Sequence, residues 1–67
     1  MTVVKIIELV GTSEKSWEDA VRQAVKEAAK TVRNIVGVHV VGFTAKVKDG
    51  EITEYRANVK IAFVVER

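Results

Sequence analysis

The segment from Val3 to Val10 limits the fold of this chain more than any other feature, because it is apolar on both faces of a strand. Lys5 and Glu8 are its only charged residues. Its apolar side chains alternate between two faces, with Val3, Ile7 and Leu9 on one and Val4, Ile6 and Val10 on the other. A strand of this kind is covered on both sides. We therefore expect one face to pack inside the subunit and the other to be buried by partner chains.

The short length of the chain leads to the same expectation. A chain near 67 residues buries only about 60% of its unfolded surface, so its own core is marginal. Small domains add disulfides, a metal or a partner chain. The sequence has 0 Cys and 1 His, which excludes disulfides, zinc thiolates, a cysteine nucleophile and a two-histidine site within one chain. We expect residues 1–67 to form a single domain that is stabilised by partner chains.

The charge balance is mild, with 11 Lys and Arg against 9 Asp and Glu, a net charge of +2. Two excess charges that are not clustered make no nucleic-acid footprint. Apolar residues make up 48% and charged residues 30%, which is too apolar for disorder and too charged for a membrane span. The first residues show neither a basic leader nor a long apolar run. We therefore expect a cytoplasmic protein without nucleic-acid or membrane partners.

A helix is predicted from Ser16 to about Asn34. Ser16, with Asp19 three residues later, resembles a capping box. One face of this segment is apolar and rich in alanine, which would let another element approach closely. Trp17 in the first turn is interpreted as a packing anchor. Gly11-Thr12-Ser13 before the helix is interpreted as a strand-to-helix turn with a cap, because it lacks the glycine spacing of a phosphate-binding loop.

Two further strands are predicted, from Val38 to Val47 and from Ile52 to Glu66. In the second, the apolar residues Tyr55, Ala57, Val59, Ile61, Phe63 and Val65 alternate with polar ones. In the first, the matching face consists of Val41, Phe43, Ala45 and Val47. This order predicts an α+β fold of the β-α-β-β type, with a three-stranded antiparallel sheet wrapped on one helix. The last strand is the longest and most regular, so we expect it at the centre, in the order 1-3-2.

The turn between these strands is predicted from the alignment of their apolar faces. A two-residue Asp49-Gly50 loop would place the faces on opposite sides of the sheet. A three-residue loop from Lys48 to Gly50, with Gly50 left-handed, aligns them. It pairs Phe43 with Tyr55 and Val47 with Glu51. We therefore expect a bulged three-residue hairpin.

No residue pattern in the sequence indicates catalysis. The serines near the helix start lack a nucleophile-elbow context, and His39 lies among valines in a predicted strand. The carboxylates Glu14, Glu18 and Asp19 are explained by capping and by the helix dipole. No calcium-loop spacing exists within one chain, although copies of one carboxylate can converge around a symmetry axis. We expect a protein that is not an enzyme.

The ensemble of motifs resembles one known family. Gly11-Thr12-Ser13 ends an apolar strand, Ser16-Trp17-Glu18-Asp19-Ala20 opens a helix that closes at Val32-Arg33-Asn34-Ile35, and Asp49-Gly50-Glu51-Ile52-Thr53-Glu54-Tyr55-Arg56 leads into Val59-Lys60-Ile61-Ala62-Phe63. With this length and element order, the chain resembles the dodecin family over nearly its whole length. The resemblance implies a hollow spherical homododecamer of tetrahedral symmetry that binds or stores a small ligand. It places the helices outside and the sheets around the interior.

The resemblance also implies a ligand site. Flavin-binding dodecins hold pairs of flavins near two-fold axes, between a stacking Trp just after the helix and a Gln of the third strand. These two positions fall on Gly37 and Arg56, so the chain resembles the branch without the stacking Trp. The implied cofactor-binding residues are Val36, Gly37, Val38 and Arg56, and the family ligand is a flavin, riboflavin or its mononucleotide (FMN).

Two alternatives remain open at this site and for the function. Arg56 either stacks on or hydrogen-bonds a flavin edge, or is an inner-face charge that a neighbouring carboxylate such as Glu54 satisfies. The protein is either a flavin-binding assembly or a structural or metal-binding one. For the second case the resemblance includes a calcium-binding relative with a similar Ser-Trp-Glu helix start. The sequence does not identify metal ligands.

Overall fold

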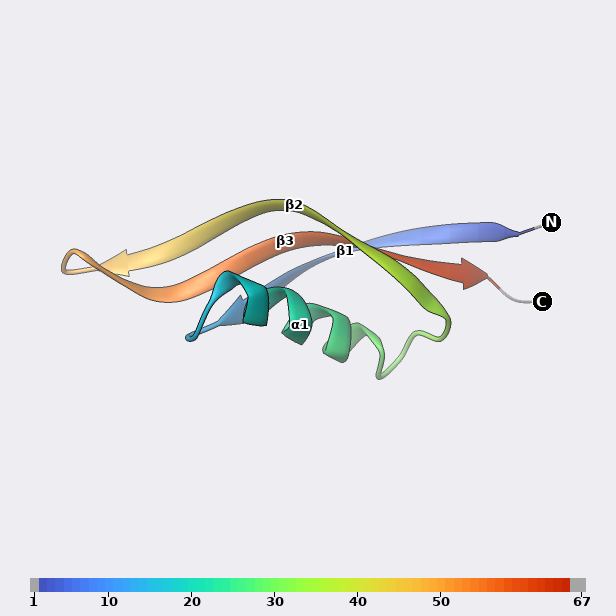
Figure 1. Ribbon diagram of the computed structural model, residues 1–67, viewed down its shortest axis with the longest axis horizontal. Coiled ribbons are helices and arrows are strands. Elements are labelled where there is room, and N and C mark those ends of the chain that lie inside the picture. Colours follow the sequence, from blue (N-terminus) through green and yellow to red (C-terminus); the bar gives the residue numbers. More distant parts are fainter. Residues whose placement is uncertain (1, 66–67) are drawn as a thin grey trace.

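The computed structural model describes residues 2–65 and has one helix and three strands (Figure 1). In chain order the elements are β1 (Val3–Ser13), α1 (Trp17–Ala28), β2 (Ile35–Lys48) and β3 (Glu51–Val65). The strands form one antiparallel sheet in the order β1-β3-β2. The predicted α+β fold, its element order and its central third strand are therefore confirmed. The final residue of the predicted last strand, Glu66, lies outside the described residues.

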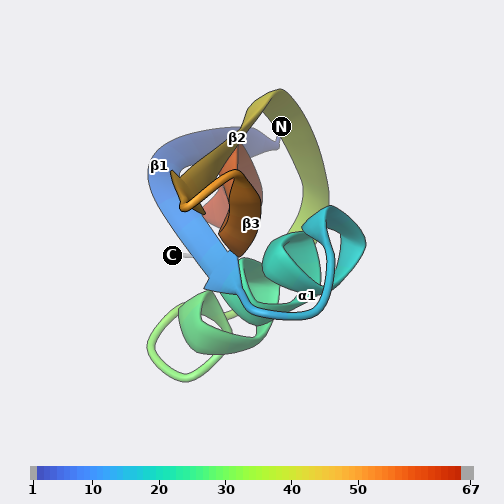
Figure 2. The same ribbon diagram turned by 90° about the vertical axis from the view of Figure 1, so that its left-hand side faces the viewer.

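The core lies between α1 and one face of the sheet (Figure 2). Its fully buried members are the alanines Ala20, Ala24 and Ala28 of α1 and the residues Ala57, Val59 and Ile61 of β3. Because alanine is short, the helix lies very close to the sheet. A Cβ atom built on Gly11 of β1 would stand 2.1 Å from the carbonyl oxygen of Ala20. Gly11 is therefore the residue of β1 that lets the helix approach.

The helix is shorter than predicted. Ser16 is its N-cap and accepts a 3.0 Å hydrogen bond from the backbone N–H of Asp19, as expected for a capping serine. The helix ends at Ala28 instead of near Asn34. Beyond it, Lys30 and Thr31 donate to carbonyls three residues back, which tightens the chain into a turn. Asn34, with a φ of 62°, then turns the chain into β2.

β1 and β2 are longer than predicted. β1 continues through Gly11-Thr12-Ser13, so these residues are paired with β3 and are not a turn. β2 begins at Ile35 and carries two bulges, at Val36 and Val41, each with one extra residue opposite a regular stretch of β3. Val41 was predicted on the inward face with Phe43. As the extra residue of a bulge it falls outside the regular alternation of β2 and is exposed, as is Phe43.

The hairpin register differs from the prediction. Lys48 pairs with Glu51, so the loop has two residues, and both have positive φ, 53° at Asp49 and 80° at Gly50. This is the backbone that a type I′ turn requires, and the left-handed Gly50 is confirmed. Phe43 pairs with Ala57 rather than Tyr55, and Val47 with Ile52 rather than Glu51.

The faces align because the shift occurs in β3 instead of in the loop. Thr53 is an extra residue between Ile52 and Glu54, and its hydroxyl donates a 3.3 Å hydrogen bond to the carbonyl of Lys46. One added residue in a strand changes which side chains share a face, just as one added residue in the loop would. The prediction that one extra residue aligns the two apolar faces was therefore correct, but this residue lies in β3 and not in the loop.

The far end of the β2–β3 hairpin extends beyond the N-terminus of α1 (Figure 1). The molecule is accordingly elongated, with extents of 52 × 20 × 13 Å. We call residues 43–52, which form this end, the hairpin arm. Three large apolar side chains of the arm are exposed in the single chain, namely Phe43, Val47 and Ile52.

Candidate functional site

The residues predicted to hold a ligand do not meet within one chain. Gly37 and Arg56 belong to the face of the sheet away from α1, whereas Val38 pairs with the buried Ile61 on the other face. Gly37 pairs with Ala62, whereas Arg56 pairs with Thr12 on one side and Thr44 on the other. Residues 56 and 62 lie on the face of β3 opposite to the buried core. They are six residues apart along the strand, or about 20 Å. A site that uses both Gly37 and Arg56 therefore requires two chains.

Arg56 is held by a neighbouring carboxylate. Its Nε donates to Oε1 of Glu54 at 2.7 Å, and both side chains belong to the face away from α1. This is the contact considered as the alternative to a ligand role. It engages one of the five donors of the guanidinium group, so an ordered Arg56 still has donors to offer a planar or anionic ligand.

The Gly37 end of the site is open surface. Nothing lies within 4 Å of a Cβ atom built on Gly37, and Val36 and Val38 on either side of it are exposed. Among residues 2–65, no aromatic ring comes within 4 Å of that position to stack on a flavin. The residues therefore fit a flavin only in part: Arg56 supplies donors, and Gly37 supplies room without a stacking surface.

The face of β1 away from α1 is apolar and exposed. Val4, Ile6 and Val10 are 47%, 49% and 59% exposed in the single chain. By contrast, Ile7 and Leu9 on the other face pack against the core. The strand is thus covered on one side only, as expected from its sequence. Large exposed apolar surfaces on small proteins mark interaction sites.

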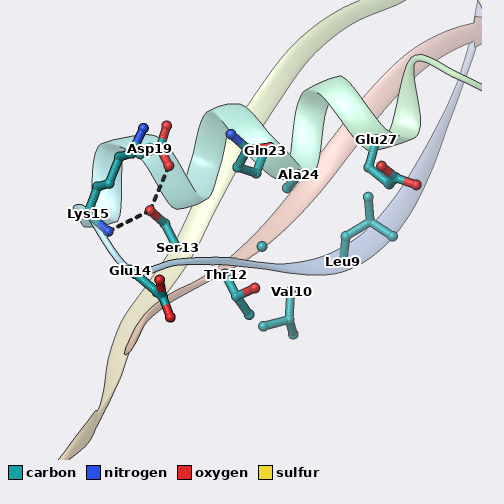
Figure 3. A pocket seen from close by; sticks show the side chains of 11 residues that line it. Leu9, Val10, Thr12, Ser13, Glu14, Lys15, Asp19, Gln23, Ala24 and Glu27 are labelled. Atoms are coloured by element: carbon teal, nitrogen blue, oxygen red, sulfur yellow. Dashed lines mark hydrogen bonds between the residues drawn. The ribbon is translucent and has the colours of Figure 1, made fainter. Parts of the chain in front are cut away.

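A groove of about 540 Å³ runs between the outer edge of β1 and α1 (Figure 3). The strand contributes Leu9, Val10 and Thr12, and the helix contributes Asp19, Gln23 and Glu27. Figure 3 shows Leu9 on the side of β1 nearer the helix, whereas Val10, Thr12 and Glu14 lie on the opposite side. The sequence analysis missed this groove. The signal for it was Gly11 opposite an alanine-rich helix face, which brings α1 close to the strand edge.

A hydrogen-bond network closes one end of the groove. The hydroxyl of Ser13, the one buried polar residue among residues 2–65, donates to Oδ2 of Asp19 at 2.6 Å and accepts from the N–H of Lys15 at 2.9 Å. Asp19 therefore pairs with Ser13, although the capping box predicted it to pair back to Ser16. Its hydrogen bond from Ser13 lowers the pKa of the Asp19 carboxyl below its ordinary value.

The lowered pKa of Asp19 predicts a loss of stability in acid. A carboxyl whose pKa is lower in the folded chain stabilises that chain above its unfolded pKa, and this contribution disappears as the pH falls through the folded value. We expect the free energy of unfolding to drop below about pH 4. Ser13→Ala should make this drop smaller. Urea denaturation between about pH 6 and pH 2 measures it, with Thr12→Ala as the control; equal pH profiles for Ser13→Ala and wild type would contradict the prediction.

Trp17 joins the helix to the hairpin, which confirms it as a packing anchor. Its indole Nε1 donates to the carbonyl of Thr44 at 2.8 Å. Its ring meets the ring of Tyr55 edge-on at 4.8 Å and lies 6.0 Å from the ring of Phe43. These contacts occupy the one Trp of the chain, so it is not free to stack on a ligand at Gly37.

Residues 2–65 contain no cluster of three or more His, Cys, Asp or Glu side chains placed to hold a metal ion. The same residues include no helix that is long and apolar enough to span a membrane.

Comparisons with known proteins agree with one another. A family model described as Dodecin matches residues 3–66. A protein named Calcium dodecin from Mycobacterium tuberculosis is 33% identical over 94% of this chain and 89% of its own. A Dodecin from Thermus thermophilus is 33% identical over 96% of this chain and 93% of its own. The solved structure of dodecin from Streptomyces coelicolor has a TM-score of 0.95 at 29% identity and covers 98% of this chain and 94% of that one.

Proposed function

Because this chain belongs to the dodecin family, we propose that it assembles into a hollow homododecamer that binds or stores a small ligand and has no catalytic role. The family resemblance is the source of the number twelve and of the tetrahedral arrangement. The described residues supply an independent reason for assembly, which is the uncovered sheet face.

The main observation in support of self-assembly is the exposed outer face of β1. Val4 and Ile6 are about half exposed in one chain although they belong to a regular strand that pairs with β3 along its whole length. Burial of an aliphatic side chain contributes about 1.5–3 kcal/mol, so covering this face with further copies would stabilise a chain whose own core is small.

We propose a flavin, riboflavin or FMN, as the default ligand, at a site formed by Val36, Gly37, Val38 and Arg56 from neighbouring copies. The room at Gly37 and the ordered guanidinium of Arg56 support this site. The missing stacking ring argues that the native protein binds a flavin weakly. The bound ligand would lie on the sheet face that lines the interior of the particle.

Calcium is the second candidate, and the relative named Calcium dodecin favours it. Since residues 2–65 of one chain hold no metal-binding cluster, this site would combine carboxylates of several copies. Isothermal titration of the assembled protein with calcium and, separately, with riboflavin distinguishes the two ligands. Heat from calcium but none from riboflavin would favour the metal-binding function.

The assembly is tested by the mass of the protein in solution. We expect light scattering at micromolar concentration to give twelve chains for the wild type. Ile6→Asp should reduce this mass, because it would bury an unpaired charge at a cost of several kcal/mol. Thr31→Asp adds the same charge at an exposed polar position and should leave the mass unchanged. A monomeric or dimeric wild type would contradict the proposal.

A further inference from the structure

The two outer edges of the sheet differ in regularity. β1 pairs with β3 over its whole length without a register shift, so its unpaired edge is straight. β2, at the other edge, is interrupted by bulges at Val36 and Val41. Bulges on an edge strand oppose the addition of another strand, whereas a straight apolar edge favours it. The stretch of β2 from Gly42 to Lys48 contains no bulge residue, so its outer edge can still pair with another strand.

The groove beside β1 has a shape suited to a strand. It follows the edge from Leu9 to Ser13, and α1 forms its other wall through Gln23 and Ala24. A strand placed there would add its backbone to the free edge of β1. Its side chains on the helix side would meet Leu9 and Ala24, and those on the opposite side would stand near Glu14 (Figure 3).

The hairpin arm has an exposed apolar face and a basic face that suit the groove beside β1. Its Val47 is 60% exposed, and an isolated two-stranded hairpin is marginally stable until something covers it. Along β2 the side chains alternate, so Ala45 and Val47 lie on one face and Lys46 and Lys48 on the other. Lys46 pairs with Glu54, which places Lys46 and Lys48 on the face away from α1.

The charges of the groove and the arm are complementary. Glu14 at the end of the groove forms no ion pair with any residue in the range 2–65, and the same holds for Lys46 and Lys48 on the arm. Glu14 stands on the face of the sheet away from α1, as the two lysines do. Two copies placed edge to edge with their helices on the same side would therefore bring Glu14 of one near Lys46 of the other.

We propose that the hairpin arm of one copy docks in the β1–α1 groove of the next, with Gly42–Lys48 pairing to the edge of β1. Lys46 meets Glu14, and its neighbours Ala45 and Val47 face the α1 side of the groove. This inference rests on the proposed self-assembly and names its contact surfaces. Because the arm and the groove are different surfaces, the contact is heterologous, and in a closed assembly such contacts form a ring. In a tetrahedral particle that ring has three copies.

Charge exchange tests the contact. We expect Glu14→Lys and Lys46→Glu each to lower the fraction of assembled protein at least tenfold at low salt, because each places like charges together. The double variant Glu14→Lys/Lys46→Glu should restore assembly. Lys26→Glu, on the exposed side of α1, is the matched control and should assemble normally. If the single variants assemble as the wild type does, or the double variant is not restored, the proposal is wrong.

A covalent cross-link provides a measurement that does not depend on charge. The chain has 0 Cys, so Glu14→Cys/Lys46→Cys introduces the only thiols. Within one chain β3 separates the two positions by about two strand spacings, or 10 Å, which is too far for a disulfide. We expect mild oxidation of the assembled protein to give a ladder that ends at the covalent trimer on a denaturing gel.

Other cross-linking results would overturn the proposal in recognisable ways. A ladder that stops at the dimer means that the contact is isologous. An assembled particle that gives no cross-link means that the groove is covered by something else, while the proposed dodecamer still stands. A wild-type protein that does not assemble removes the proposed function itself.

Discussion

Replacing Gly11 by valine is expected to lower the free energy of unfolding by about 3 kcal/mol or more. The reason is the contact between β1 and α1. A Cβ atom at this position would lie 2.1 Å from the carbonyl oxygen of Ala20 and 2.9 Å from the Cβ of Ala24. The first of these atoms is helix backbone, so relief requires the whole helix to move away from the sheet. That movement would loosen the alanine layer that forms the core.

The matched control is Gly42→Val, in the edge strand β2. Nothing lies within 4 Å of a Cβ atom built there, and its φ is not positive, so we expect little change in the folding of the subunit. Both variants are compared by urea denaturation, followed by the fluorescence of Trp17. Since Trp17 packs on Tyr55 and Phe43, its emission reports the separation of helix and hairpin. Equal stabilities of the two variants would show that the close approach at Gly11 does not contribute to the free energy of unfolding.

The second large effect concerns the ligand. Gly37→Trp combined with Arg56→Gln is expected to bind riboflavin at least tenfold more tightly than the native protein and to quench its fluorescence. An indole adds about 150–250 Å² of apolar surface and a stacking ring, and its Cβ atom meets no obstacle within the chain. A fluorescence titration of both proteins measures affinity and quenching together. The absorption spectrum after adding riboflavin or FMN gives a second reading.

The single variants separate the two contributions. Gly37→Trp alone tests the stacking ring, and Arg56→Gln alone tests the hydrogen bonds, since it also releases Glu54 from its ion pair. Thr31→Trp is a suitable control because it places an indole at an exposed position outside the proposed site and outside the proposed subunit contact. Tight and strongly quenched binding by the native protein would contradict the expectation, because Gly37 would then be no obstacle to flavin binding.

The parts of the fold in which apolar residues recur at regular intervals could be predicted from the sequence. The two-residue alternation of β3 placed Ala57, Val59 and Ile61 inside, and its length placed it at the centre of the sheet. The one-sided alanine pattern of the helix correctly indicated a close approach. The exposed outer face of β1 followed from counting apolar faces against the single helix available to cover them.

The details that depend on single backbone positions were not predictable. Alignment of the two hairpin faces requires one extra residue, and the sequence does not say whether it stands in the loop or at Thr53. The helix pattern continues to Val32, yet the backbone leaves the helix at Ala28 so that the left-handed Asn34 can start β2. The groove was missed because it depends on how closely α1 approaches β1 at Gly11 and Ala20. The periodicity of the sequence does not give that distance.

The separation of Gly37 from Arg56 has the same origin. A family resemblance aligns both residues with one site, and the strand register shows that one chain presents them about six residues apart on β3. The candidate site could therefore be predicted as a set of residues but not as a pocket within one subunit. In the proposed assembly its completion would depend on the symmetry of the particle, which no pattern within one chain encodes.

The pairing of β1 with β3 also determines when this protein can fold during its synthesis. Val3 pairs with Val65 and Ser13 with Tyr55, so the first strand made must wait for the last one. Until then it has no partner, because β1 and β2 do not touch in the order β1-β3-β2. Such distant pairings are slow to form and leave apolar segments exposed in the nascent chain. A chain that ends before β3 would thus leave β1 without a partner strand, and such exposed apolar edges are prone to aggregate.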